Sequence, residues 1–109
     1  MTEYDPHEAI NYIYMNAPEY AKAKGQLAQL ETYKSSVKAI MMKKSSEQSL
    51  GGQEREAYAS KEYQDLCVAI GKATEDAEKL KWQLEAAKMR FQAWQTESAN
   101  NRQLEKFTV

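Results

Sequence analysis

The sequence predicts an all-α protein: a helical hairpin with a long, coiled-coil-like C-terminal helix and a short N-terminal helix, assembling into an oligomer. Three observations predict this fold. The 109 residues include only 4 Gly and 2 Pro, so few positions interrupt a helix. Apolar residues recur at spacings of three and four, as on one helical face. In the C-terminal half this pattern persists for almost five heptads. The length corresponds to one domain.

The first element is a short helix within residues 1–17. Asp5 is a suitable N-cap, Pro6 suits the first helical position, and Glu8 completes a capping box. Pro18 is expected to end this helix, because the residue before a proline is pushed away from helical geometry.

The second element is a basic amphipathic helix over residues 18–46. Its apolar residues share one face: Leu27, Leu30, Tyr33, Val37, Ile40 and Met41. A polar stretch follows, and the pair Gly51-Gly52 makes it the strongest break in the chain. We therefore place the main turn at residues 47–53.

The third element is a long heptad helix over residues 54–96. Two series of apolar residues run along it at seven-residue spacing, offset by three, which makes them the a and d positions of a heptad. The a series is Tyr63, Ile70, Ala77, Leu84 and Phe91, and the d series is Leu66, Ala73, Leu80, Ala87 and Trp94. This pattern predicts a left-handed helical seam. Polar residues replace both series afterwards, so residues 97–109 are expected to be a frayed tail.

The side of the long helix opposite this seam is also apolar in places. Trp82 and Met89 both occupy the f position, Ala86 and Ala93 lie beside them, and Val68 precedes Trp82 by two heptads. A large indole at this position predicts a second packing surface. The alternative is that the short N-terminal helix folds back and covers it.

Two helices share a single seam rather than a closed core. The apolar burial along one seam compensates only a small part of the conformational entropy that the chain loses on folding. We therefore expect copies of the chain to associate. The predicted oligomer interface consists of Tyr63, Leu66, Ile70, Leu80, Trp82, Leu84, Met89, Phe91 and Trp94.

Charge is distributed unevenly although the net charge is only −1. Residues 1–19 carry four acidic and no basic side chains, whereas residues 20–46 carry six lysines against Glu31 alone. Ammonium groups suit phosphate oxygens, and a tyrosine can stack on a base of a single strand. The predicted DNA-binding residues are Lys22, Lys24, Lys34, Lys38, Lys43, Lys44 and Tyr33. The segment has no Arg, which favours sequence-independent contact with the backbone. The alternative is a solvated lysine face.

Other functional classes receive little support. His7 is the only histidine and Cys67 the only cysteine, so a catalytic triad would depend on a residue near the N-terminus. We expect a first-turn helical role for His7 and a packing role for Cys67, and no catalytic residues, metal or cofactor. A single thiol favours a reducing, cytoplasmic setting. No apolar run approaches the ~20 residues of a membrane span, and we expect no signal peptide.

The chain resembles the UvsY family of phage recombination mediators in three stretches. These are Tyr20-Ala21-Lys22 with Leu30-Glu31 and the basic run 34–44; Tyr63 after a glycine turn; and Leu80-Lys81-Trp82-Gln83-Leu84 followed by Phe91. The resemblance implies a non-catalytic, ring-forming protein that binds single-stranded DNA in the host cytoplasm. It also implies partners, namely a RecA-like recombinase, which it helps to load, and single-strand-binding protein. The alternative is a structural coiled-coil adaptor that recruits a protein partner without binding DNA.

Overall fold

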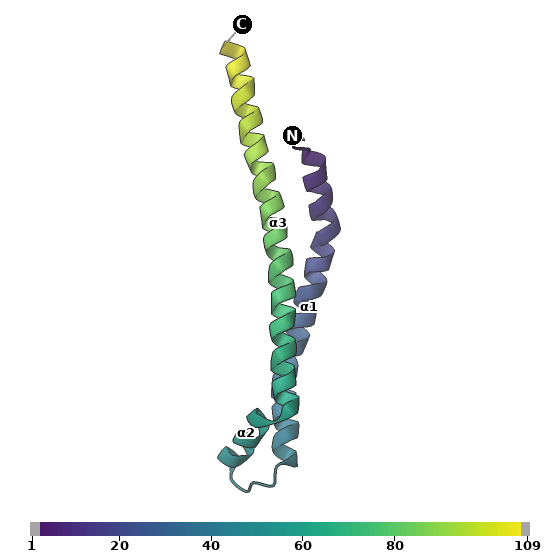
Figure 1. The fold of residues 1–109 in the computed structure, drawn as a ribbon, viewed down its shortest axis with the longest axis vertical. Helices are drawn as coiled ribbons and strands as arrows, with labels where there is room; N and C mark the ends of the chain where they lie inside the picture. Colours follow the sequence, from purple (N-terminus) through teal and green to yellow (C-terminus); the bar gives the residue numbers. More distant parts are fainter. Residues whose placement is uncertain (1–2, 108–109) are drawn as a thin grey trace. The chain divides into compact units, whose positions relative to one another are not determined.

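A computed structural model describes residues 3–107 and contains three helices in this range (Figure 1): α1 (Pro6–Lys44), α2 (Leu50–Ala59) and α3 (Lys61–Phe107). No strand occurs among these residues, so the predicted all-α class and the long C-terminal helix are confirmed. Contacts group the chain into two compact units. The terminal unit comprises the chain up to Tyr20 together with the chain from Lys79 on, and the turn unit comprises Ala21–Glu78.

Helix α1 begins as predicted but does not end at Pro18. The Asp5 carboxylate accepts a hydrogen bond from the His7 backbone N–H at 2.9 Å and so caps the helix. Pro18 lies inside α1, and the prediction of a separate short helix over residues 1–17 was therefore wrong. Half-buried Ile13 and Leu27, on either side of Pro18, are fourteen residues apart and share one helical face. Keeping that face continuous offsets the backbone donor that proline removes.

Helix α2 occupies part of the region predicted to be a turn. It starts at Leu50 and runs through both glycines, with Ser49 as its N-cap. The Ser49 hydroxyl accepts from the Gly52 N–H at 3.1 Å. Gly52 is buried, and a Cβ there would lie 2.9 Å from Ser49 Oγ and 3.0 Å from Glu47 Oε2. This glycine therefore allows the preceding loop to approach the helix closely; it does not terminate the helix.

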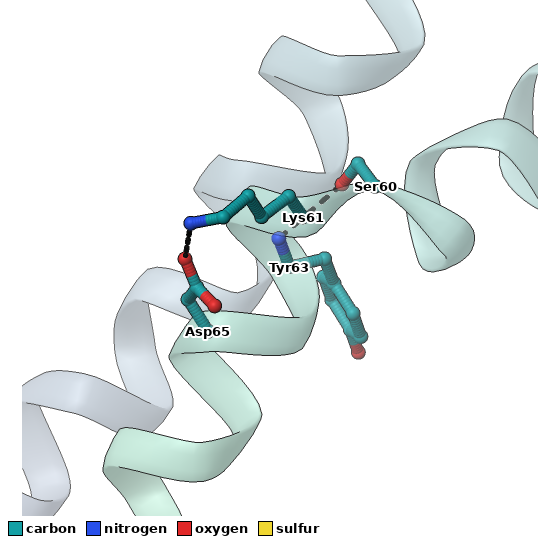
Figure 2. Close-up of polar contacts among 4 residues, drawn as sticks. All are labelled: Ser60, Lys61, Tyr63 and Asp65. Carbon is teal, nitrogen blue, oxygen red and sulfur yellow. Dashed lines mark hydrogen bonds and ion pairs between the residues drawn. The ribbon is translucent and has the colours of Figure 1, made fainter.

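The predicted helix over residues 54–96 is interrupted at Ser60. The backbone of Ser60 is extended, with φ −65° and ψ 149°, and the Ser60 hydroxyl donates a hydrogen bond to the Ala57 carbonyl at 2.6 Å. The same oxygen accepts from the Tyr63 N–H at 3.2 Å and caps α3 (Figure 2). At the start of α3, Lys61 Nζ lies 2.8 Å from the carboxylate of Asp65, four residues further along the helix. Serine offers the backbone these alternative partners, which explains a break that the heptad pattern does not reveal.

The tail was predicted to fray from residue 97, but α3 continues to Phe107. Residues 108–109 of the predicted tail lie outside the described residues. Most residues after Ser98 favour helices, and extending an existing helix requires no new nucleation. The loss of the apolar pattern removes packing instead, since Leu104 and Phe107 are exposed.

The heptad register of the long helix agrees with the burial of its side chains. In the turn unit all five seam positions from Tyr63 to Ala77 are half-buried or buried, and Ala77 is 5% exposed. In the terminal unit the five positions from Leu80 to Trp94 are all half-buried. No large side chain among the described residues is fully buried; the buried apolar residues are Ala9, Ala57 and Ala77.

Each unit holds an antiparallel pair of helical segments. In the terminal unit the Tyr12 hydroxyl donates to Gln83 Oε1 at 3.1 Å, and the ring of Tyr4 lies 6.5 Å from that of Trp94. In the turn unit, Ala23 and Leu30 of α1 line a hollow together with Ala73 of α3. Ala23 and Ala73 are small, which allows the two helices to approach closely here.

Candidate nucleic-acid interface

The predicted DNA-binding residues all lie on the α1 part of the turn unit, but they do not form one face. Lys22, Tyr33 and Lys44 recur every eleven residues, which keeps them within about 40° around the helix. We call these three residues the lysine row. Both lysines of the row are exposed, and the Tyr33 side chain is 46% exposed. Tyr33 Oη accepts a hydrogen bond from Gln29 Nε2 at 3.1 Å, which orients the phenol.

The other lysines lie elsewhere around α1. Lys43 is exposed beside Lys44 in the last turn of the helix, where positive charge also favours the helix dipole. Lys24 and Lys34 are exposed on the flank that carries Lys38. The row therefore brings together only part of the predicted set.

Lys38 is engaged within the turn unit. Its Nζ lies 3.6 Å from a carboxylate oxygen of Glu54 and 4.9 Å from the ring centroid of Tyr58. Tyr58 through hydrogen bonding, and Glu54 through its charge, raise the pKa of Lys38. Tyr58 in turn packs edge-on against Tyr63 with centroids 5.1 Å apart. Lys38 thus connects α1 to α2.

The structure sets the basic segment beside an acidic one. Residues 47–78 carry eight acidic and three basic side chains, and they supply the rest of the turn unit. The turn unit as a whole contains nine basic and nine acidic residues and is electrically neutral. Summing charge over residues 47–78 would have revealed this from the sequence. Because the turn unit is neutral overall, a polyanion would meet the lysine row on α1 and no broad basic surface.

The predicted oligomer interface separates into two faces. Its seam residues are half-buried within their own units, whereas Trp82 is 59% and Met89 is 54% exposed. The alternative in which the N-terminal segment covers Trp82 is therefore not what the structure shows. The N-terminal residues pack instead along the neighbouring flank, where they line a hollow with Gln83, Ala86, Ala87 and Arg90.

Other candidate sites show little organisation. Within residues 3–107 no three His, Cys, Asp or Glu side chains gather so that they could hold a metal ion. In the same range no helix has the length and apolarity to cross a membrane. Cys67 is a half-buried free thiol next to the seam, consistent with the packing role expected for it.

Comparison of the chain with protein-family models, with curated proteins and with solved structures gives no match.

Proposed function

We propose that this protein is a non-catalytic, self-associating module that binds single-stranded DNA without sequence preference and acts as a recombination mediator. The observation that carries the proposal is the lysine row, where two exposed ammonium groups flank an exposed phenol on one side of α1. Lysines attract phosphates of any sequence, and the phenol provides a surface on which a base can stack. Loading of a RecA-like recombinase onto strands coated by single-strand-binding protein is the role that the UvsY resemblance adds.

The neutral charge of the turn unit limits what one copy can do. Two phosphate contacts and one stacked base make a weak site, so useful affinity requires several copies on one strand. Self-association of the chain would supply this multiplicity. Lys43, beside Lys44, is positioned to add a further phosphate contact, whereas Lys38 serves to hold α2 in place.

Fluorescence anisotropy with a labelled oligo-dT tests the proposal. Wild-type protein should bind at low salt, with an affinity that falls steeply as salt increases. The double substitution Lys22→Gln and Lys44→Gln should weaken binding and reduce the slope of log K against log salt by about 1.4 per copy, because each phosphate contact to a single strand contributes about 0.7. Tyr33→Leu should weaken binding while leaving that slope unchanged.

The matched control replaces Lys61 and Lys72, two exposed lysines of the same unit that pair with Asp65 and Asp76. Lys61→Gln with Lys72→Gln changes the net charge by the same amount and should leave DNA affinity close to wild type. Absence of binding by the assembled wild-type protein at low salt would exclude the proposed function.

The exposed Trp82 and Met89 favour a second candidate, a structural adaptor that binds a protein partner through α3 and ignores DNA. It predicts no change in oligo-dT anisotropy at any salt concentration. It also predicts a partner whose capture is lost with Trp82→Ala or with truncation of the tail at Phe107.

A further inference from the structure

A stripe of four exposed residues runs along α3 on the side opposite the seam. Trp82, Ala86, Met89 and Ala93 follow spacings of four, three and four, and all are exposed. At about 100° per residue they fall within a band of about 60° around the helix. We call this band the outer stripe. It has the heptad spacing of a helix-packing seam, and it lies entirely in the terminal unit.

The chain exposes far more surface than a folded monomer of its mass. Its accessible area is 8710 Å² at 12.5 kDa, whereas a monomeric protein of this mass typically exposes about 6,200 Å². The excess of roughly 2,500 Å² per chain exceeds the roughly 800 Å² that each partner buries in a standard interface. The excess surface is therefore larger than one such interface requires, and the outer stripe is one exposed apolar part of that surface.

The order of large and small residues in the outer stripe makes it complementary to itself. The sequence of sizes is large, small, large, small. If two stripes pack antiparallel about a two-fold axis between Ala86 and Met89, Trp82 of one copy lies opposite Ala93 of the other, and Met89 lies opposite Ala86. Each large side chain then enters the space that a small one leaves. Parallel packing would instead place indole against indole and methyl against methyl.

We propose that two copies of this protein pair antiparallel through the outer stripe of α3, with the two-fold axis between Ala86 and Met89. The contact is isologous, so it closes at two copies and leaves other surfaces free for further assembly. The inference deepens the self-association in the proposed function by naming its partner and geometry. The stripe shares no residue with the lysine row, so dimerisation and DNA binding can be measured separately.

Light scattering without DNA tests whether the stripe carries the contact. Wild type should show at least the mass of a dimer at micromolar concentration. Trp82→Ala should weaken pairing about thirtyfold or more, as expected for a central aromatic residue. The matched control is Tyr14→Ala, which removes an aromatic residue that is 77% exposed in the same unit and should retain the wild-type mass. A monomeric wild type, or a Trp82→Ala variant of unchanged mass, would overturn the proposal.

Distances between spin labels test the antiparallel direction. Asn100 is exposed beyond the stripe, and Asn100→Cys with Cys67→Ala leaves one site for the label. In the antiparallel pair the two labelled positions are 25 residues apart along the common axis, or about 38 Å at 1.5 Å per residue. A pulsed dipolar measurement should give a distance close to this value, and a distance under about 20 Å would indicate parallel packing and contradict the proposal. Because DNA is absent from both experiments, loss of the DNA-binding proposal would leave their outcome unaffected.

Discussion

At the scale of single residues, one of the four glycines differs from the other three. A Cβ added at Gly25, Gly51 or Gly71 meets no atom within 4 Å, so contacts within one chain do not require glycine at these positions. Gly52 differs because the Ser49 and Glu47 side chains occupy the space that a Cβ would need. The sequence showed the pair Gly51-Gly52 but could not distinguish its members, since the difference arises from how the loop before α2 folds over one of them.

Gly52→Ala should destabilise the protein by about 1–2 kcal/mol, because the new methyl group displaces the Ser49 cap or the Glu47 side chain. The neighbouring change Gly51→Ala should stabilise it by up to about 1 kcal/mol, because alanine favours a helix and the space is open. Urea unfolding followed by circular dichroism measures both changes. Equal effects of the two substitutions would contradict the assigned role of Gly52.

At the scale of elements, two boundaries depend on local chemistry that competes with the helical pattern. Pro18 predicted a break and the helix continues, whereas Ser60 lies inside a predicted helix and the helix is interrupted. A proline removes one backbone hydrogen bond, which packing on both sides offsets. A serine hydroxyl offers both a donor and an acceptor, and at Ser60 both are used. Neither outcome follows from helix propensity alone. The first depends on packing on both sides of Pro18, and the second on the hydrogen bonds of the Ser60 hydroxyl.

Pro18→Ala should stabilise the protein by up to about 3 kcal/mol, because it restores the missing donor within α1 and removes the proline ring from the helix interior. The expected readout is a higher midpoint of urea denaturation with unchanged helicity in the native baseline. Ala17→Gly, on the exposed side one residue earlier, should change stability in the opposite direction by about 1 kcal/mol. A lower midpoint for Pro18→Ala would show that α1 needs the proline.

At the scale of the whole molecule, the chain has a seam but no closed core. Alanines are its only buried apolar residues among those described, and the larger seam residues stay half-exposed. Burial of apolar area is the main driving force for folding, so stability of one chain should be low and coupled to association. Attraction between opposite charges also favours the pairing of segments within the turn unit. The basic stretch of α1 and the acidic residues 47–78 both belong to that unit.

Leu80→Asp should reduce helicity and lower the oligomeric mass, because it places a charge in the half-buried seam of the terminal unit. We expect a loss of about 2–4 kcal/mol from lost packing and desolvation of the carboxylate. Gln92→Asp introduces the same charge at an exposed position of the same helix and should change stability by less than about 0.5 kcal/mol. Circular dichroism and light scattering give the two readouts. Wild-type helicity and mass for Leu80→Asp would show that the heptad register is wrong.

The pattern of amino acids alone was enough to predict the helical class and the position of the seam on the long helix. These follow from the period of the apolar residues, which is a local property of the chain. The folded chain shows in addition that α1 passes through Pro18, that Ser60 divides the third predicted helix, that Trp82 and Met89 stay exposed, and that Lys38 is engaged with Glu54 and Tyr58. At Ser60 the cause is a pair of hydrogen bonds to residues three positions away. At the other sites it is packing between segments that lie apart in the sequence, and no period along the chain encodes either kind of contact.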